Sequence, residues 1–125
     1  MKELVESILE NLSSREVFLF RVRCSGCGAE YGNKPRRFSK AGVEPENGNR
    51  KVIFDVLYEQ ELRQARQFAI RDAAEQMNYC PVCKRLVCNG CFLICDELDL
   101  CRECAHRLGQ TGQSDLHGIV EEAVS

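Results

Sequence analysis

The cysteines carry the most evident chemistry in this sequence. Nine of its 125 residues are cysteine, and eight of these form four Cys-x-x-Cys pairs. The pairs are Cys24/Cys27, Cys80/Cys83, Cys88/Cys91 and Cys101/Cys104, and Cys95 lies outside them. A Cys-x-x-Cys turn directs two thiolates at one point while neighbouring backbone N–H groups face the sulfurs, and two such turns complete a tetrahedral zinc site. The spacing therefore predicts two four-cysteine sites that bind two Zn²⁺ ions.

Disulfide bonds and iron are the alternatives to zinc. The N-terminal segment has acidic residues at Glu3, Glu6 and Glu10 and lacks the uninterrupted apolar run of a signal peptide, so we expect a cytoplasmic protein. In a reducing cytoplasm, paired cysteines bind metal more often than they form disulfides. All-cysteine tetrahedral sites most often hold zinc, although a rubredoxin-like iron site would use the same ligands. Because four thiolates leave zinc no open position for water, we expect a protein that is not an enzyme.

The four pairs can combine into two sites in three ways. The 17 residues between Cys83 and Cys101 match the spacer of about 15–20 residues expected within one zinc module. This favours an interleaved cross-brace, with Cys24, Cys27, Cys88 and Cys91 in site 1 and Cys80, Cys83, Cys101 and Cys104 in site 2. A sequential arrangement, which joins the first pair to the second and the third to the fourth, stays open. So does a nested one, in which the second and third pairs share a metal.

The surroundings of the last three pairs indicate a treble clef. Asn89 and Gly90 predict a hairpin turn, and "CRECAHRLG" predicts a short helix that starts at two ligands and ends at Gly109. The segments "NYCPVCKRLVCNGC" and "LCRECA", with "CSGCG" as a distant first knuckle, resemble zinc-binding modules of uncharacterised bacterial proteins. More distantly, they resemble the cross-brace treble clefs of the RING and FYVE types. They lack the His ligand of RING domains and the basic lipid motif of FYVE domains, so the resemblance implies neither ubiquitin transfer nor phosphoinositide binding.

Helices and strands must position these knuckles. We expect a small metal-stabilised α+β domain over residues 1–108, followed by a polar, mobile segment over 109–125. Periodic apolar residues predict an amphipathic helix over 2–13, and the alternation in "REVFLFRVRC" predicts a strand that buries Phe18, Phe20 and Val22. A short strand at "KVIFDV" is expected to precede a long inserted helix over about 55–78, and the treble clef follows over 78–108.

The long helix carries an apolar stripe that we expect to cover the domain's own core. The stripe consists of Tyr58, Leu62, Ala65, Phe68 or Ala69, and Ala73 or Met77. No stretch of the sequence approaches the roughly 18 apolar residues of a membrane span, so we expect no membrane partner.

Three residues outside the predicted sites have their own chemistry. Cys95 lies among apolar residues beside Asp96 and Glu97, and this predicts a buried, inert thiol. His106 follows the last ligand and is expected to cap or pack, because eight cysteines already complete both sites. His117 is expected in the polar tail.

The leading functional hypothesis is a non-enzymatic zinc-binding scaffold for protein–protein interaction, or for self-association, through the long helix. The alternative is a nucleic-acid-binding zinc ribbon that uses basic residues. These are Arg15, Arg21, Arg23, Lys34, Arg36, Arg37 and Lys40. The formal net charge of −2 disfavours it, since two zinc ions on eight thiolates add −4 and give about −6. A third hypothesis is a thiol/zinc redox switch.

Overall fold

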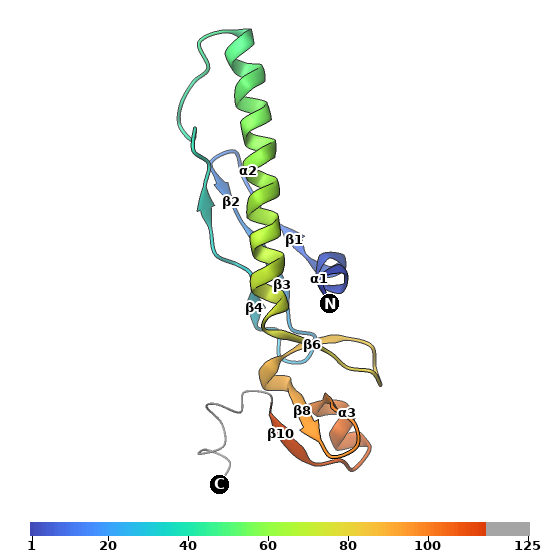
Figure 1. Ribbon diagram of the computed structural model, residues 1–125. Helices are drawn as coiled ribbons and strands as arrows, with labels where there is room; N and C mark the ends of the chain where they lie inside the picture. The colour runs from blue at the N-terminus through green and yellow to red at the C-terminus, as the bar shows by residue number, and fades with distance from the viewer. Residues whose placement is uncertain (115–125) are drawn as a thin grey trace.

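One long helix organises the molecule. The computed structural model describes residues 1–114, and Figure 1 shows helix α2 (Gly48–Ala74) with the N-terminal strands beside it and the C-terminal elements gathered near its C-terminal end. The fold is a small α+β arrangement, as predicted for its class. The assignment of residues 1–108 to one domain stays a prediction.

The N-terminal part forms two small antiparallel sheets. Its elements are α1 (Lys2–Ile8), β1 (Glu10–Asn11), β2 (Val17–Phe18), β3 (Phe20–Arg23), β4 (Glu30–Tyr31) and β5 (Arg36–Arg37). One sheet has the order β1-β3-β4, and in the other β2 pairs with β5. The strand expected over "REVFLFRVRC" is therefore two strands, interrupted at Leu19, whose N–H donates to Ser13 Oγ at 2.9 Å. Phe18, Phe20 and Val22 are buried, as predicted.

The first helix is shorter than the predicted span 2–13. It ends at Ile8, because the backbone becomes extended at Leu9 and Glu10–Asn11 pairs with β3. The Glu10 carboxylate accepts a hydrogen bond from Arg21 Nε at 3.0 Å, a cross-strand contact that stabilises the extended pairing. Val5 is the buried residue of α1, whereas Leu4 and Ile8 stay exposed.

Helix α2 begins and ends earlier than the predicted span of about 55–78. The Asn47 side-chain oxygen caps its N-terminus by accepting a hydrogen bond from the Arg50 N–H at 2.9 Å. The strand predicted at "KVIFDV" is wrong: this segment is helical, and Val52 and Val56 stay exposed with no sheet to join. The apolar stripe predicted on the helix is confirmed at Ala65, Ala69 and Ala73, which are buried.

The C-terminal part holds the other two sheets. Its elements are β6 (Met77–Tyr79), β7 (Leu86–Cys88), the 3-10 turn η1 (Asn89–Cys91), β8 (Phe92–Cys95), β9 (Leu100–Cys101), α3 (Arg102–Arg107) and β10 (Gly112–Ser114). β6 pairs with β7, and the other sheet has the order β10-β8-β9. Residues 112–114, which belong to the polar segment predicted over 109–125, pair with β8. Residues 115–125, including His117, lie outside the described residues.

Two groups of buried side chains form the core. One joins Phe18, Phe20 and Phe38 to Ala65 and Ala69 on the middle of α2. The other surrounds the cysteines and also contains Val5, Val22, Ile70, Ala73 and Leu100. Five of the nine cysteines are thus buried members of this second core.

Candidate metal centre

Strand β3 presents the first knuckle. Cys24 follows its last residue, and the backbone N–H groups of Gly26 and Cys27 donate to Cys24 Sγ at 3.2 and 3.4 Å. A side chain at Gly26 would lie 3.2 Å from Cys91 Sγ, so glycine leaves room for a sulfur from a distant turn. The local sequence therefore builds the turn, and packing brings the second turn against it.

Four sulfurs meet at this knuckle. The Sγ atoms of Cys24, Cys27, Cys88 and Cys91 all lie within 4.8 Å of one another. Cys27 Sγ and Cys88 Sγ are 3.8 Å apart, and the Cys88 N–H donates to Cys24 Sγ at 3.2 Å. Cys24 and Cys88 are buried, whereas Cys27 is exposed. We call this group cluster 1.

A second group of four lies around the N-terminus of α3. The Sγ atoms of Cys80, Cys83, Cys101 and Cys104 lie within 4.8 Å of one another, and we call them cluster 2. Cys83 Sγ and Cys101 Sγ are 3.8 Å apart. The N–H groups of Cys101 and Cys104 donate to Cys80 Sγ and Cys101 Sγ, each at 3.4 Å. Three of these four cysteines are buried.

The sulfur spacing fits a tetrahedral ion and does not fit disulfides. Zinc–thiolate bonds of about 2.3 Å give a tetrahedron whose edges are about 3.8 Å, which is the separation of one sulfur pair in each cluster. A disulfide would need sulfurs about 2 Å apart, and all nine cysteines are free thiols. The structure therefore groups the eight cysteines into the interleaved sets favoured by their spacing. That they bind an ion is an inference from this geometry.

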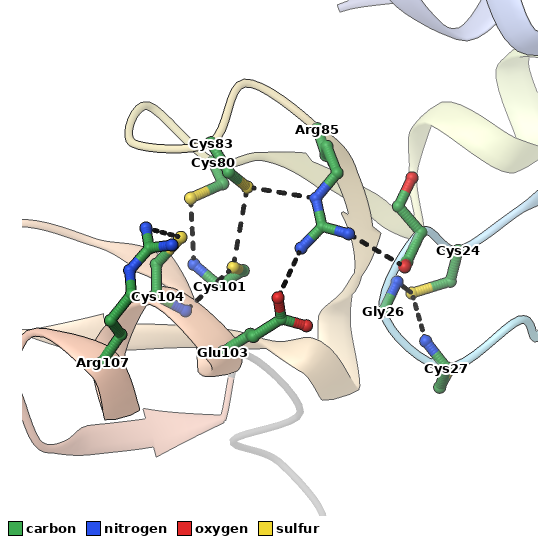
Figure 2. Close-up of polar contacts among 11 residues, drawn as sticks. Cys24, Gly26, Cys27, Cys80, Cys83, Arg85, Cys101, Glu103, Cys104 and Arg107 are labelled. Carbon is green, nitrogen blue, oxygen red and sulfur yellow. Dashed lines mark hydrogen bonds and ion pairs between the residues drawn. The ribbon is translucent and has the colours of Figure 1, made fainter.

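Arg85 connects the two clusters. Figure 2 shows its guanidinium reaching three groups: Nε donates to Cys83 Sγ, Nη1 to the Ser25 carbonyl, and Nη2 to the Glu103 carboxylate, each at 3.4 Å. Arg107 Nη2 lies 3.5 Å from Cys104 Sγ. Cluster 2 thus has two cationic donors on its sulfurs. Sequence reasoning missed both, and the only local sign was the arginine two residues after Cys83.

The pKa values show that the thiols within each cluster differ in how readily they ionise. Burial alone would raise the pKa of Cys24, but the N–H groups of Cys88, Cys27 and Gly26 outweigh it and lower that pKa to about 6. Burial opposes ionisation of Cys83 too, yet the Arg85 side chain lowers its pKa to about 6. Burial and neighbouring thiols raise the pKa of Cys91, and they raise that of Cys104 to about 12. Ionising all four thiols therefore requires a cation between them.

Cys95 and His106 lie outside both clusters. Cys95 is half-buried rather than fully buried, and its N–H donates to Asp99 Oδ1 at 3.1 Å. Burial, followed by the carboxylates of Asp99 and Asp96, raises the pKa of the Cys95 thiol. His106 lines a hollow of about 390 Å³ between the clusters, next to Arg85 and Arg102. Neither residue completes a ligand set.

The basic residues considered for nucleic acid are largely paired with carboxylates. Arg15 lies 3.3 Å from Asp55, Arg21 lies 3.0 Å from Glu10 and 3.3 Å from Glu30, Arg23 lies 3.6 Å from Glu10, and Lys34 lies 3.6 Å from Asp72. Arg37 donates to the Ala41 carbonyl at 3.4 Å. Four of the seven cations are thus already compensated. Arg36 makes a different contact, over the ring of Phe68.

No family model, curated protein or solved structure matches this chain. Among residues 1–114, none of the helices combines the length and the apolar character needed to cross a bilayer. The geometry of the two clusters is therefore the main evidence about function.

Proposed function

We propose that this chain is a non-enzymatic zinc-binding protein in which two four-cysteine sites, interleaved as a cross-brace around a treble clef, hold the C-terminal half together. The observation that carries this proposal is that four sulfurs lie within 4.8 Å of one another in each cluster, with one pair in each at 3.8 Å. Cys24, Cys27, Cys88 and Cys91 would bind one ion, and Cys80, Cys83, Cys101 and Cys104 the other. Four thiolates fill the coordination of zinc, so the ion would supply cross-linking and leave no position for substrate.

Native mass spectrometry of protein purified without chelator tests this proposal. We expect two zinc ions per chain, and alkylation with peptide mapping should label Cys95 while the eight clustered thiols stay protected. Iron, a single metal ion, or labelling throughout both clusters in the native protein would contradict it.

We further propose that the protein presents α2 to another protein. Val52, Ile53 and Val56 are 62%, 43% and 51% exposed, and they lie together on the N-terminal half of the helix. Exposed apolar side chains that gather in one place mark interaction surfaces more often than scattered ones do.

A photo-crosslinking amino acid at Val56 tests the contact in cells. We expect discrete, protease-sensitive adducts from this position and none from Gln110, an exposed control position outside α2. Nuclease-sensitive adducts would favour the nucleic-acid alternative, and equal adducts from both positions would contradict a specific surface.

A further inference from the structure

A shallow hollow on the outer side of α2 gathers cations that the metal centre does not use. Its volume is about 350 Å³, and it is lined by Arg36, Arg63, Gln64, Gln67, Phe68 and Arg71. The five helical residues recur at one-turn spacing, so they lie on one face of α2. None of the lining residues is acidic, and the three arginines give the hollow a strongly positive charge.

These three arginines form no ion pair among residues 1–114. Arg66, on another side of the same helix, lies 3.4 Å from the Glu6 carboxylate. In the part of the chain that the structure describes, by contrast, Arg36, Arg63 and Arg71 have no carboxylate within ion-pair distance. The Arg36 guanidinium instead lies 4.0 Å from the centroid of the Phe68 ring, a cation–π contact that holds it at the edge of the hollow.

The spacing of the arginines indicates the shape of a ligand. Arg63 and Arg71 are eight residues apart, which is about 12 Å along the helix axis. Phe68 lies between them along the helix and is 37% exposed. An extended peptide rises about 3.3 Å per residue and turns every second side chain to the same side. Two acidic side chains four positions apart therefore span about 13 Å, with the middle residue of the same face over the ring.

The surrounding charges favour a short anionic segment over nucleic acid. Glu59 lies one turn before Arg63 and Glu75 one turn after Arg71, and both are exposed. A phosphate backbone that continued along α2 would meet a carboxylate at each end of the hollow. The net charge of −2 adds long-range repulsion of a polyanion. A short peptide whose two acidic side chains pair with Arg63 and Arg71 does not extend as far as Glu59 or Glu75, so it avoids their repulsion.

We propose that this hollow binds an extended acidic segment of a partner protein, with two carboxylates paired to its arginines and an apolar side chain against Phe68. Guanidinium groups suit this role because they pair with carboxylates in a bidentate geometry. The inference rests on the proposed interaction function and names the chemistry of the partner.

Nitrogen-15 spectra of the arginine Nε–Hε groups, recorded on the zinc-loaded full chain, test the proposal directly. The probe is a seven-residue peptide with two glutamates four positions apart and a leucine midway between them. The control peptide has the same leucine, and glutamines replace the two glutamates. We expect saturable shifts at Arg36, Arg63 and Arg71 with the acidic peptide only, weakened by high salt. Arg50, an exposed arginine of α2 outside the hollow, should not shift.

Variants separate the hollow from general charge attraction. The double substitution Arg63→Gln and Arg71→Gln should weaken binding of the acidic peptide roughly 2- to 30-fold, as expected for two exposed ion pairs. Arg50→Gln removes a like charge from the same helix and should leave the affinity nearly unchanged.

Two results would overturn the inference: equal shifts at all exposed arginines, or tighter binding of a thymidine octanucleotide than of the acidic peptide. Absence of binding, with two zinc ions bound and protein adducts still formed at Val56, would overturn this inference and leave the proposed function standing.

Discussion

Single residues decide how tightly each knuckle can turn. Gly28 and Lys84 occupy equivalent positions, directly after the second cysteine of a pair, and both have positive φ, of 78° and 62°. Their N–H groups donate to the carbonyls of Cys24 and Cys80 at 2.9 and 2.8 Å. A residue with a side chain loses roughly 1–2 kcal/mol in this left-handed conformation. Lys84 therefore carries strain that Gly28 does not.

We expect Gly28→Ala to lower the free energy of unfolding of the zinc-loaded protein by about 1–2 kcal/mol, because alanine resists the positive φ. Gly48→Ala is the matched control: Gly48 lies in the first turn of α2 with open space around its Cα and no positive φ. There alanine should be neutral or stabilise by up to about 1 kcal/mol. Denaturant unfolding in excess zinc measures both, and equal losses would contradict the backbone argument.

The Arg85 side chain contacts cluster 2 and the first knuckle of cluster 1, so its removal should affect both clusters. It donates to Cys83 Sγ in cluster 2 and to the carbonyl of Ser25 in the first knuckle. Groups that hydrogen-bond to ligands typically change metal affinity by about 10- to 100-fold. We expect Arg85→Gln to weaken zinc binding at cluster 2 by about tenfold in chelator competition. Arg102→Gln removes a guanidinium that donates to the Gly90 carbonyl rather than to a sulfur, and should leave the affinity unchanged.

At the scale of elements, the knuckle after β3 and the knuckle at α3 differ in protection. Cys27 is exposed, and among the described residues no arginine side chain contacts a sulfur of cluster 1. Cys101 and Cys104 lie buried at the start of α3, and Arg107 Nη2 donates to Cys104 Sγ at 3.5 Å. Cationic donors draw charge from the sulfurs of cluster 2, so we expect cluster 1 to hold the more reactive thiolates.

Mild hydrogen peroxide should therefore oxidise cluster 1 first, which would support the redox hypothesis. Two thiolates would give two electrons to peroxide, forming one S–S bond while peroxide leaves as two hydroxide ions, and one zinc ion would be released. We expect the first disulfide in peptide maps to include Cys27, and reductant with added zinc to restore the original mass. Loss of both ions together, or first oxidation within cluster 2, would argue against this order.

At the scale of the whole molecule, the two cores depend differently on the cysteines. Five buried cysteines belong to the core that includes Leu100 and Ile70, whereas the core of Phe18, Phe20 and Phe38 contains none. Metal that binds only the folded state contributes its binding energy to folding. Removal of metal should thus affect the two halves unequally.

Hydrogen exchange after chelation measures this difference. We expect amides of β6 to α3 to lose protection, because thiolates brought together without a cation repel one another. Amides around Ala65 and Ala69 should keep more of their protection, since their packing partners are aromatic. Uniform loss along residues 1–114 would show one cooperative unit instead.

Local pattern determined much of this fold and of its candidate site. Spacing favoured one of three possible groupings of the eight cysteines, and the structure places their sulfurs in those same two sets, although their role as ligands stays a prediction. Alternation correctly predicted the burial of Phe18, Phe20 and Val22, and helical spacing that of Ala65, Ala69 and Ala73. These features follow from short-range geometry, since a turn or a periodic face is encoded within a few residues.

Tertiary structure decided the features that depend on distant partners. Helix α1 ends at Ile8 because Glu10 meets Arg21, and β10 forms because residues 112–114 lie beside β8. Arg85 reaches a sulfur, a carbonyl and a carboxylate that only packing assembles, and Arg36 meets Phe68 across 32 positions of the sequence. The sequence by itself therefore predicted two groups of four thiols and favoured one pairing of the Cys-x-x-Cys turns. Only the folded chain decided which cations face those thiols and which face solvent. Contacts between residues far apart in the sequence produce no periodic pattern within a short segment, so the sequence alone does not predict them.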